Sequence, residues 1–283
     1  MSDKASLEPV DYLVVGHVAH DLTPEGWRLG GTAAYSALTA KALGYRVGIV
    51  TASGPETSLD ILSGIPIVSI DSQRSTTYEN IYTGHGRVQH IRAQATRIDL
   101  NVVPDVWKKA SIIHIGPIAS EVDAVLPTGF SPALLGLTPQ GWMRQWNAEG
   151  HVSPTQWINS EPALKQAGAV VLSREDVGGD EEIIEHMAGL TKILAVTEAD
   201  AGCVLYWHGD RRRFYAPKVR EVDATGAGDI FAAAFFTRLL GTHDPWESAR
   251  FATQIASHSV TRAGLDGMPT PKEIEAAKME VLQ

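Results

Sequence analysis

Short apolar runs alternate with helix-like segments along most of this chain. Strands of a parallel sheet read as unbroken apolar runs, because helices cover both faces of the sheet. Runs of this kind are Tyr12–Gly16, Arg46–Thr51, Ile112–Ile115, Ala133–Leu137, Ala169–Leu172 and Ile193–Thr197. The pattern predicts an α/β fold with a central, mostly parallel sheet, whose binding site lies beyond the carboxyl ends of the strands.

Helical patterns fill the intervals between the strands. Thr32–Leu43 is rich in alanine and is ended by Gly44, which is typical of a helix closed by glycine. Another helix is predicted at Asp180–Leu190. We expect Cys203–His208 and Arg213–Ala216 to form an antiparallel pair of strands. Three more helices are predicted after this pair, at Asp229–Leu240, Pro245–Val260 and Pro271–Leu282.

Residues 65–98 have a different texture. Thr76–Tyr82 and Arg87–Ala93 alternate between apolar and polar residues around Gly84-His85-Gly86, which is hairpin patterning. We therefore expect one domain, residues 1–283, that contains a small antiparallel β subregion at 65–98. This subregion is a candidate lid over the site.

Composition narrows the class of protein. The chain has 283 residues and a net charge of −9, which argues against broad nucleic-acid binding. No apolar stretch approaches the roughly 18 residues of a membrane span. Cys203 is the single cysteine, so no internal disulfide is possible, and the expected location is the reducing cytoplasm. The sequence contains no G-x-x-x-x-G-K-[ST] motif, so a P-loop ATPase is not expected. No G-x-G-x-x-G fingerprint follows the first strand, which argues against a dinucleotide enzyme.

The most informative segment is Asp223-Ala224-Thr225-Gly226-Ala227-Gly228-Asp229, followed by an apolar run. Small residues allow a tight turn, and the apolar run after them predicts a helix that begins there. The first amides of a helix lack internal partners and attract anions. The amides of Ala227, Gly228 and Asp229 are therefore expected to hold a phosphate. Asp229 is expected to stay ionised, because the helix dipole favours its charge, and to accept a proton from a substrate hydroxyl.

This segment resembles the second signature of the ribokinase-like carbohydrate kinases, the PfkB family, which contains D-[TA]-T-G-A-G-D. The resemblance covers nearly the whole chain. It implies a three-layer α/β/α sandwich with a small β lid, and a kinase that uses ATP and Mg²⁺. Asp229 then matches the catalytic base, and residues 226–229 match the anion hole.

The resemblance also places the acceptor substrate. Asp21, after the first strand, matches the family's aspartate that holds substrate hydroxyls, and Gly30-Gly31 matches the start of the first signature. Tyr35 stands where the family usually has asparagine, so simple ribose recognition is in doubt. Tyr35 is equally compatible with packing in the core.

Three stretches resemble a subgroup that includes myo-inositol kinases. They are Gly16-His17-Val18 with Asp21, Thr76–Asn80 in the lid region, and Gln140–Arg144 after a central strand. Asn80 and Gln140 each offer a hydrogen bond to a polyol, and Arg144 offers an anchor for a phosphate or a carboxylate.

The nucleotide side is expected at residues that follow later strands: Ser173, Asp176, Thr197, Gly202 and Thr225. Ser173 and Asp176 replace the family's N-x-x-E pair, and Asp176 is the expected Mg²⁺ residue, acting through water. Ala199 replaces a family glycine. By family analogy, adenine lies between Val219–Val222 and Thr253–Arg262.

The sequence thus predicts a kinase that phosphorylates a small sugar or an inositol-like polyol, with no nucleic-acid or membrane partner. A nucleoside acceptor is the alternative within this class, since Tyr35 offers a ring for a base. The other alternative is a binding or regulatory protein that has lost turnover, because Tyr35, Ser173 and Ala199 depart from the family. Whether two chains pair through the lid is left open.

Overall fold

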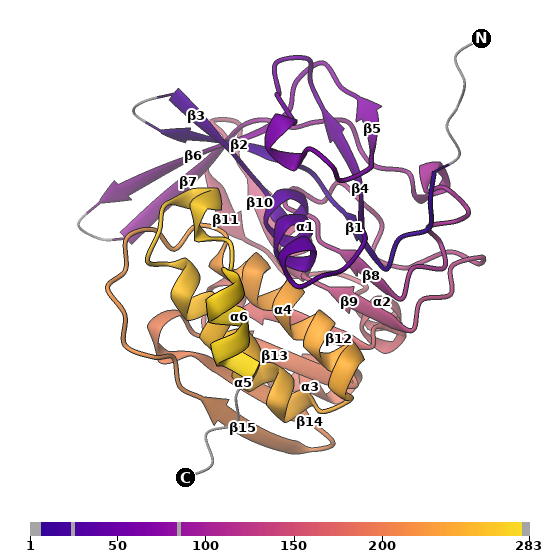
Figure 1. The fold of residues 1–283 in the computed structure, drawn as a ribbon. Coiled ribbons are helices and arrows are strands. Elements are labelled where there is room, and N and C mark those ends of the chain that lie inside the picture. Colours follow the sequence, from indigo (N-terminus) through magenta and orange to yellow (C-terminus); the bar gives the residue numbers. More distant parts are fainter. Residues whose placement is uncertain (1–6, 24–25, 84–85, 279–283) are drawn as a thin grey trace.

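One main sheet organises the molecule (Figure 1). The structure is a computed structural model that describes residues 7–23, 26–83 and 86–278. In this part of the chain the main sheet has the strand order β15-β14-β13-β12-β9-β8-β1-β4-β5. Its strands are β1 (Tyr12–Val15), β4 (Val47–Ser53), β5 (Ile67–Asp71), β8 (Ile112–Ile115), β9 (Leu134–Leu137), β12 (Ala169–Ser173), β13 (Ile193–Thr197), β14 (Cys203–Trp207) and β15 (Asp210–Phe214). All neighbouring pairs are parallel except β13–β14 and β14–β15, so the predicted α/β class is confirmed.

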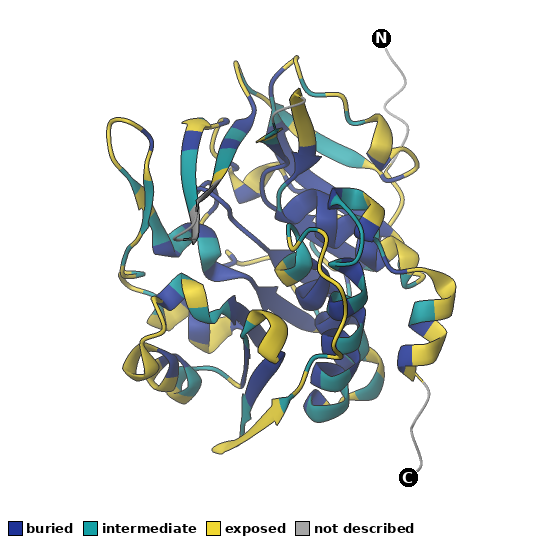
Figure 2. Cartoon of the chain, turned by 90° about the vertical axis from the view of Figure 1, so that its left-hand side faces the viewer, coloured by how far each residue is buried: buried dark blue, intermediate teal, exposed yellow. Residues whose placement is uncertain are grey.

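Helices cover both faces of this sheet. The first face carries α1 (Thr32–Ala42), α4 (Ala227–Thr242), α5 (Pro245–Ser259) and α6 (Pro271–Lys278); the second carries α2 (Glu161–Gln166) and α3 (Glu181–Leu190). Side chains of β1 alternate between the two resulting cores. Tyr12 and Val14 pack with the first set of helices, and Leu13 and Val15 with the second. Buried residues therefore line both faces of the sheet (Figure 2), which makes the predicted three-layer sandwich.

A four-stranded sheet of order β3-β2-β6-β7 forms the lid. Its strands are β2 (Ala19–Thr23), β3 (Gly26–Gly30), β6 (Thr76–Thr83) and β7 (Gly86–Ala93). The predicted β6–β7 hairpin is present, and its turn at residues 84–85 lies outside the described residues. The β2–β3 hairpin was not expected, because its sequence has no regular apolar alternation and its strands are exposed toward the turn end.

Two further differences concern the edges of the main sheet. β5 falls in the region assigned to the lid, yet it pairs in parallel with β4, and its half-exposed pattern fits an edge strand. β15 begins at Asp210, earlier than the predicted strand Arg213–Ala216, so the arginine run 211–213 lies within the strand. The turn itself lies at His208 and Gly209, which both have positive φ.

Short elements complete the chain. The hairpin of β10 (Arg144–Trp146) and β11 (Val152–Pro154) packs beside β7. The 3₁₀ segments are η1 (Asp60–Leu62), η2 (Leu100–Val102), η3 (Pro139–Met143), η4 (Arg174–Val177), η5 (Ala199–Ala201) and η6 (Gly264–Gly267). No helix in the described ranges has the length and apolar character that a membrane crossing requires.

Candidate active site

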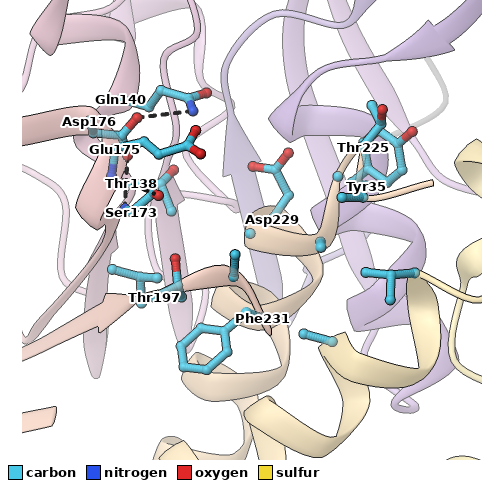
Figure 3. A pocket seen from close by; sticks show the side chains of 18 of the residues that line it. Tyr35, Thr138, Gln140, Ser173, Glu175, Asp176, Thr197, Thr225, Asp229 and Phe231 are labelled. Atoms are coloured by element: carbon cyan, nitrogen blue, oxygen red, sulfur yellow. Dashed lines mark hydrogen bonds between the residues drawn. The ribbon is translucent and has the colours of Figure 1, made fainter. Parts of the chain in front are cut away.

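A cavity of about 1170 Å³ opens at the carboxyl ends of the parallel strands. The lid lies on one side of it, and α4 and α5 lie on the other. Figure 3 shows side chains from both sides facing this space. The lining includes all but one of the expected site residues: Asp21, Gly31, Tyr35, Asn80, Gln140, Arg144, Ser173, Asp176, Thr197, Gly202, Thr225, Gly226, Ala227, Gly228 and Asp229.

The first turn of α4 presents free amides to the cavity. Gly226 precedes the helix in the left-handed conformation, with φ 79°, which L side chains rarely adopt. The amides of Gly228 and Asp229 have no acceptor among the described residues. The Ala227 amide instead donates to the Ala224 carbonyl at 3.2 Å. Two of the three predicted amides are therefore available to an anion.

The carboxylate of Asp229 faces the cavity and accepts a hydrogen bond from the Thr32 hydroxyl at 2.7 Å. Burial raises the pKa of Asp229 to about 6, although the Thr32 bond and the nearby Arg144 charge favour ionisation. The helix dipole was expected to favour the charged form, and withdrawal from water acts against it. Asp229 is still ionised at neutral pH, and as a base it is matched to that range.

The Tyr35 ring packs against Gly226, in the turn before α4. A Cβ placed on Gly226 would lie 2.2 Å from the Tyr35 Cε1 atom, so the phenol ring occupies the space of a side chain at position 226. Tyr35 is 2% exposed and belongs to the core beneath α1 and α4, and burial raises its pKa well above the ordinary value. Tyr35 therefore packs in the core and also borders the cavity, and its contact with a substrate stays a prediction.

The two glycines before α1 make room for neighbouring groups. A Cβ on Gly30 would lie 2.0 Å from the Asp21 carboxylate, because β2 and β3 pair at this point. Gly31 has φ 83°, and a Cβ there would lie 2.6 Å from the His17 carbonyl. Gly31 borders the cavity, whereas Gly30 does not, because Asp21 covers it.

Polar side chains from the lid and from η3 enter the other side of the cavity. The Arg144 guanidinium lies over the Tyr78 ring, 5.8 Å from its centre. Burial raises the pKa of both Asp176 and Asp229, and the charge of Arg144 opposes this rise. The Gln140 amide donates to Asp176 at 3.2 Å (Figure 3). Asn80 accepts a bond from the lid residue Gln89 at 2.9 Å. Asn80 and Gln140 thus each retain one polar group for a ligand.

Asp176 closes the first turn of η4. Its carboxylate accepts the Ser173 amide at 2.8 Å as well as the Gln140 amide, and burial raises its pKa. The described residues contain no group of three metal-ligating side chains. This chemistry fits a Mg²⁺ ion that is held mainly through water and phosphate oxygens, with Asp176 and the adjacent Glu175 at its side.

The turn after β13 forms the neighbouring wall. Ala199, at the family's glycine position, has φ 49°, so it holds a left-handed conformation that glycine adopts without strain. Gly202 is needed, because a Cβ there would lie 2.0 Å from the Phe214 carbonyl. Glu198 pairs with Arg174 at 3.0 Å and with Arg213, and these pairs fix the turn. Farther along, Val219 and α5 residues form an apolar end of the cavity.

Thr32, Gln89 and Thr138 are among the polar residues of the cavity that were not expected from the sequence. Thr32 directly follows Gly30-Gly31 at the start of α1, and this position was the available signal. Gln89 reaches the site because β7 pairs with β6, which places it opposite Asn80. Thr138 directly follows the apolar run of β9, and a polar residue at the end of a parallel strand was again a usable signal.

Comparison with known proteins agrees with this geometry. The family model described as pfkB family carbohydrate kinase matches residues 162–273. A pyrophosphate-dependent kinase in the ribokinase family, solved with a pyrophosphate analog and myo-inositol, superposes with a TM-score of 0.76 at 21% identity over 94% of this chain and 99% of its own. This chain matches that family model over part of its length and has the ribokinase-like fold. It is a phosphotransferase that acts on a hydroxyl group.

Other proteins that this chain resembles differ in substrate. The cytidine kinase of Thermococcus kodakarensis is 28% identical over 80% of this chain and 87% of its own length. Ribokinase of Arabidopsis thaliana, solved with ribose and ATP, has a TM-score of 0.70 at 16% identity over 96% of this chain and 100% of its own. Ribokinase-like kinases thus include ATP-using members, and their acceptors are small molecules.

Proposed function

We propose that this pfkB kinase transfers the γ-phosphoryl group of ATP to a hydroxyl of a small sugar or an inositol-like cyclic polyol. The observation that carries the proposal is the position of Asp229, whose carboxylate faces the cavity beside two free amides at the start of α4. A general base and an anion hole then stand on one rigid turn. This is the arrangement that phosphoryl transfer requires.

In this mechanism Asp229 accepts the proton of the reacting hydroxyl, and Thr32 orients the carboxylate. The amides of Gly228 and Asp229 stabilise the negative charge that moves with the phosphoryl group. Arg144 adds a positive charge from the opposite wall, since it lies close enough to lower the pKa of Asp229. The acceptor is oriented by Asp21, whose carboxylate packs against Gly30, by the amide nitrogen of Asn80 and by the amide oxygen of Gln140.

The far part of the cavity suits a nucleotide. Val219, the α5 residue Ala256 and Val260, which directly follows α5, provide apolar surface for a base. Thr225 also lines the cavity and directly precedes the anion hole in sequence. When bound, ATP supplies the phosphoryl group and Mg²⁺ neutralises its oxygens. Ser173, Asp176, Thr197 and Gly202 would line the metal and phosphate side.

A nucleoside acceptor is the second candidate, because the cytidine kinase relative matches most of this chain. The structure removes one reason that favoured it. Tyr35 is packed beneath Gly226 and is 2% exposed, so its ring is not free to stack on a base. A small polyol remains the better-supported acceptor.

The test is a turnover assay with purified protein, Mg²⁺ and a panel of acceptors that contains myo-inositol, D-fructose, D-ribose and cytidine. Each acceptor is combined with ATP and, separately, with pyrophosphate, because one structural neighbour uses that donor. We expect ATP-dependent phosphorylation that is fastest with a polyol or sugar. Ligand binding without turnover for every pair would support the non-catalytic alternative instead.

The catalytic assignment has its own test. Asp229→Asn keeps the size of the side chain and its bond from Thr32, but it removes the base. We expect kcat to fall by at least about 10²-fold, with little change in acceptor affinity measured by calorimetry. Asp123→Asn, which neutralises an exposed carboxylate outside the site, is the matched control. A loss below tenfold in the folded variant would contradict the role of Asp229.

A further inference from the structure

A buried chain of hydrogen bonds runs from the core to the cavity through β1, β8 and the end of β9. The Tyr12 hydroxyl lies 2.9 Å from Nδ1 of His114, and Nε2 of His114 lies 2.9 Å from the Thr138 hydroxyl. Tyr12 and His114 have no exposed surface, and Thr138 is 7% exposed and borders the cavity. Nothing in the proposed mechanism uses these three residues.

The direction of these bonds follows from the histidine. Burial lowers the pKa of His114 to about 3, so its ring is neutral, with one nitrogen that donates and one that accepts. Among the described residues, Nδ1 of His114 is the partner of the Tyr12 hydroxyl. A buried phenol without an acceptor is unfavourable, so Tyr12 donates to Nδ1. Nε2 then carries the proton and donates to the Thr138 oxygen.

Thr138 is left with its own hydrogen to donate. It occupies the position that precedes η3, where a threonine oxygen often caps the helix, but its side chain makes no capping bond. It also lies close to the catalytic turn. Thr138 and Thr32 both lie against Gly116, since a Cβ on Gly116 would lie 2.7 Å from the Thr138 oxygen and 2.3 Å from a methyl carbon of Thr32. Thr32 is the residue whose hydroxyl donates to Asp229.

We propose that Thr138 is a specificity-determining residue, whose hydroxyl donates a hydrogen bond to an acceptor-substrate oxygen next to the reacting one. His114 and Tyr12 are positioning residues that fix its direction. This inference rests on the proposed function. The carboxylates of Asp21 and Asp229 only accept hydrogen bonds, whereas each hydroxyl oxygen of a polyol also needs a donor. Thr138 supplies one on the floor of the cavity, where Figure 3 shows it among the lining side chains.

The experiment measures binding of myo-inositol, D-ribose and cytidine by calorimetry without a phosphoryl donor, and KM values with ATP. Thr138→Val is expected to weaken binding of the tightest acceptor by about tenfold and to leave the KM for ATP unchanged. Thr138→Ser is expected to restore most of this loss. Tyr12→Phe, which removes the group that orients His114, is expected to weaken acceptor binding about threefold without touching the cavity.

Thr237→Val is the matched control, because Thr237 is a buried threonine of α4 whose hydroxyl bonds only within its helix. It should bind acceptor as the wild type does. Wild-type affinity in folded Thr138→Val, an equal loss in Thr138→Ser, or a raised KM for ATP instead would overturn the proposal. A wild type that binds none of the three probes would overturn it too, whereas binding without turnover would contradict only the proposed function.

Discussion

At the scale of single residues, the main result is the conflict between burial and charge at Asp229. Its place in the first turn of α4 favours the carboxylate, but the cavity wall withdraws it from water, and the net effect raises its pKa to about 6. A base with this pKa is both ionised and reactive near neutral pH. The short motif around Asp229 contains no information on this burial, which comes from α1 and from the opposite wall.

The pH dependence of activity follows from this value. Protonated Asp229 cannot accept the hydroxyl proton, so kcat/KM should fall below about pH 6 and should approach a tenfold loss per pH unit. An ordinary aspartate, with a pKa of 3.8, would keep full activity to well below pH 5. A pH–rate profile measures this, with unfolding monitored at each pH. A plateau that extends to pH 4.5 in folded protein would contradict the assignment.

The same pKa makes a prediction about stability. A carboxyl group whose pKa is higher in the folded than in the unfolded state binds more protons when folded, so its contribution to stability is lost as pH rises through about 6. Above that pH the buried carboxylate destabilises the folded state, and Asp229→Asn removes this destabilisation because the amide does not ionise. We expect the variant to melt at a higher temperature than the wild type at pH 8, with the difference shrinking at pH 5. Calorimetric melting curves at both pH values test this.

At the scale of elements, the start of α4 depends on a contact with α1. Gly226 turns the chain with a positive φ, and the Tyr35 ring of α1 fills the space where a side chain would stand. In this chain Gly226 therefore meets a packing requirement in addition to forming a turn. The replacement of the family's asparagine by Tyr35 strengthens that requirement in this chain.

Gly226→Ala tests this contact. The left-handed conformation costs an L residue about 1–2 kcal/mol, and the added Cβ must also displace the Tyr35 ring. We expect a loss of stability of at least that size and a loss of turnover above tenfold. Gly241→Ala, in the last turns of the same helix with nothing within 4 Å of its Cβ, should melt at or slightly above the wild-type temperature.

At the scale of the whole molecule, one buried carboxylate joins the main sheet to the lid. Glu121 has no exposed surface and accepts bonds from the amides of His17, Ile118 and Ala119 at 2.7 to 3.0 Å. His17 in turn contacts the hydroxyl of Thr76, the first residue of lid strand β6, at 2.7 Å. The loops after β1 and β8 are thereby fixed to the lid beside Asp21.

Glu121→Gln should weaken this joint. In the variant, an NH₂ group would replace one carboxylate oxygen of Glu121 and would face backbone N–H donors, from which it cannot accept a hydrogen bond. The loss of hydrogen bonds to a buried charged group costs about 3 kcal/mol. We expect a clear fall in the free energy of unfolding and a higher KM for the acceptor. Glu185→Gln, on the exposed face of α3, is the matched control and should change neither quantity. Unchanged stability of Glu121→Gln would show that the loops are held elsewhere.

The sequence by itself determined most strands of the main sheet, the longer helices, the α/β class and the tight turn before α4. These are local properties, since apolar periodicity and short motifs reflect burial and turn geometry along neighbouring positions. Only the tertiary structure decided that β2 and β3 join the lid, that β5 joins the main sheet, and that Thr32 and Thr138 border the site. Those outcomes depend on contacts between residues far apart in the chain, and neither local periodicity nor a single motif records which distant segment will supply the partner or exclude the water.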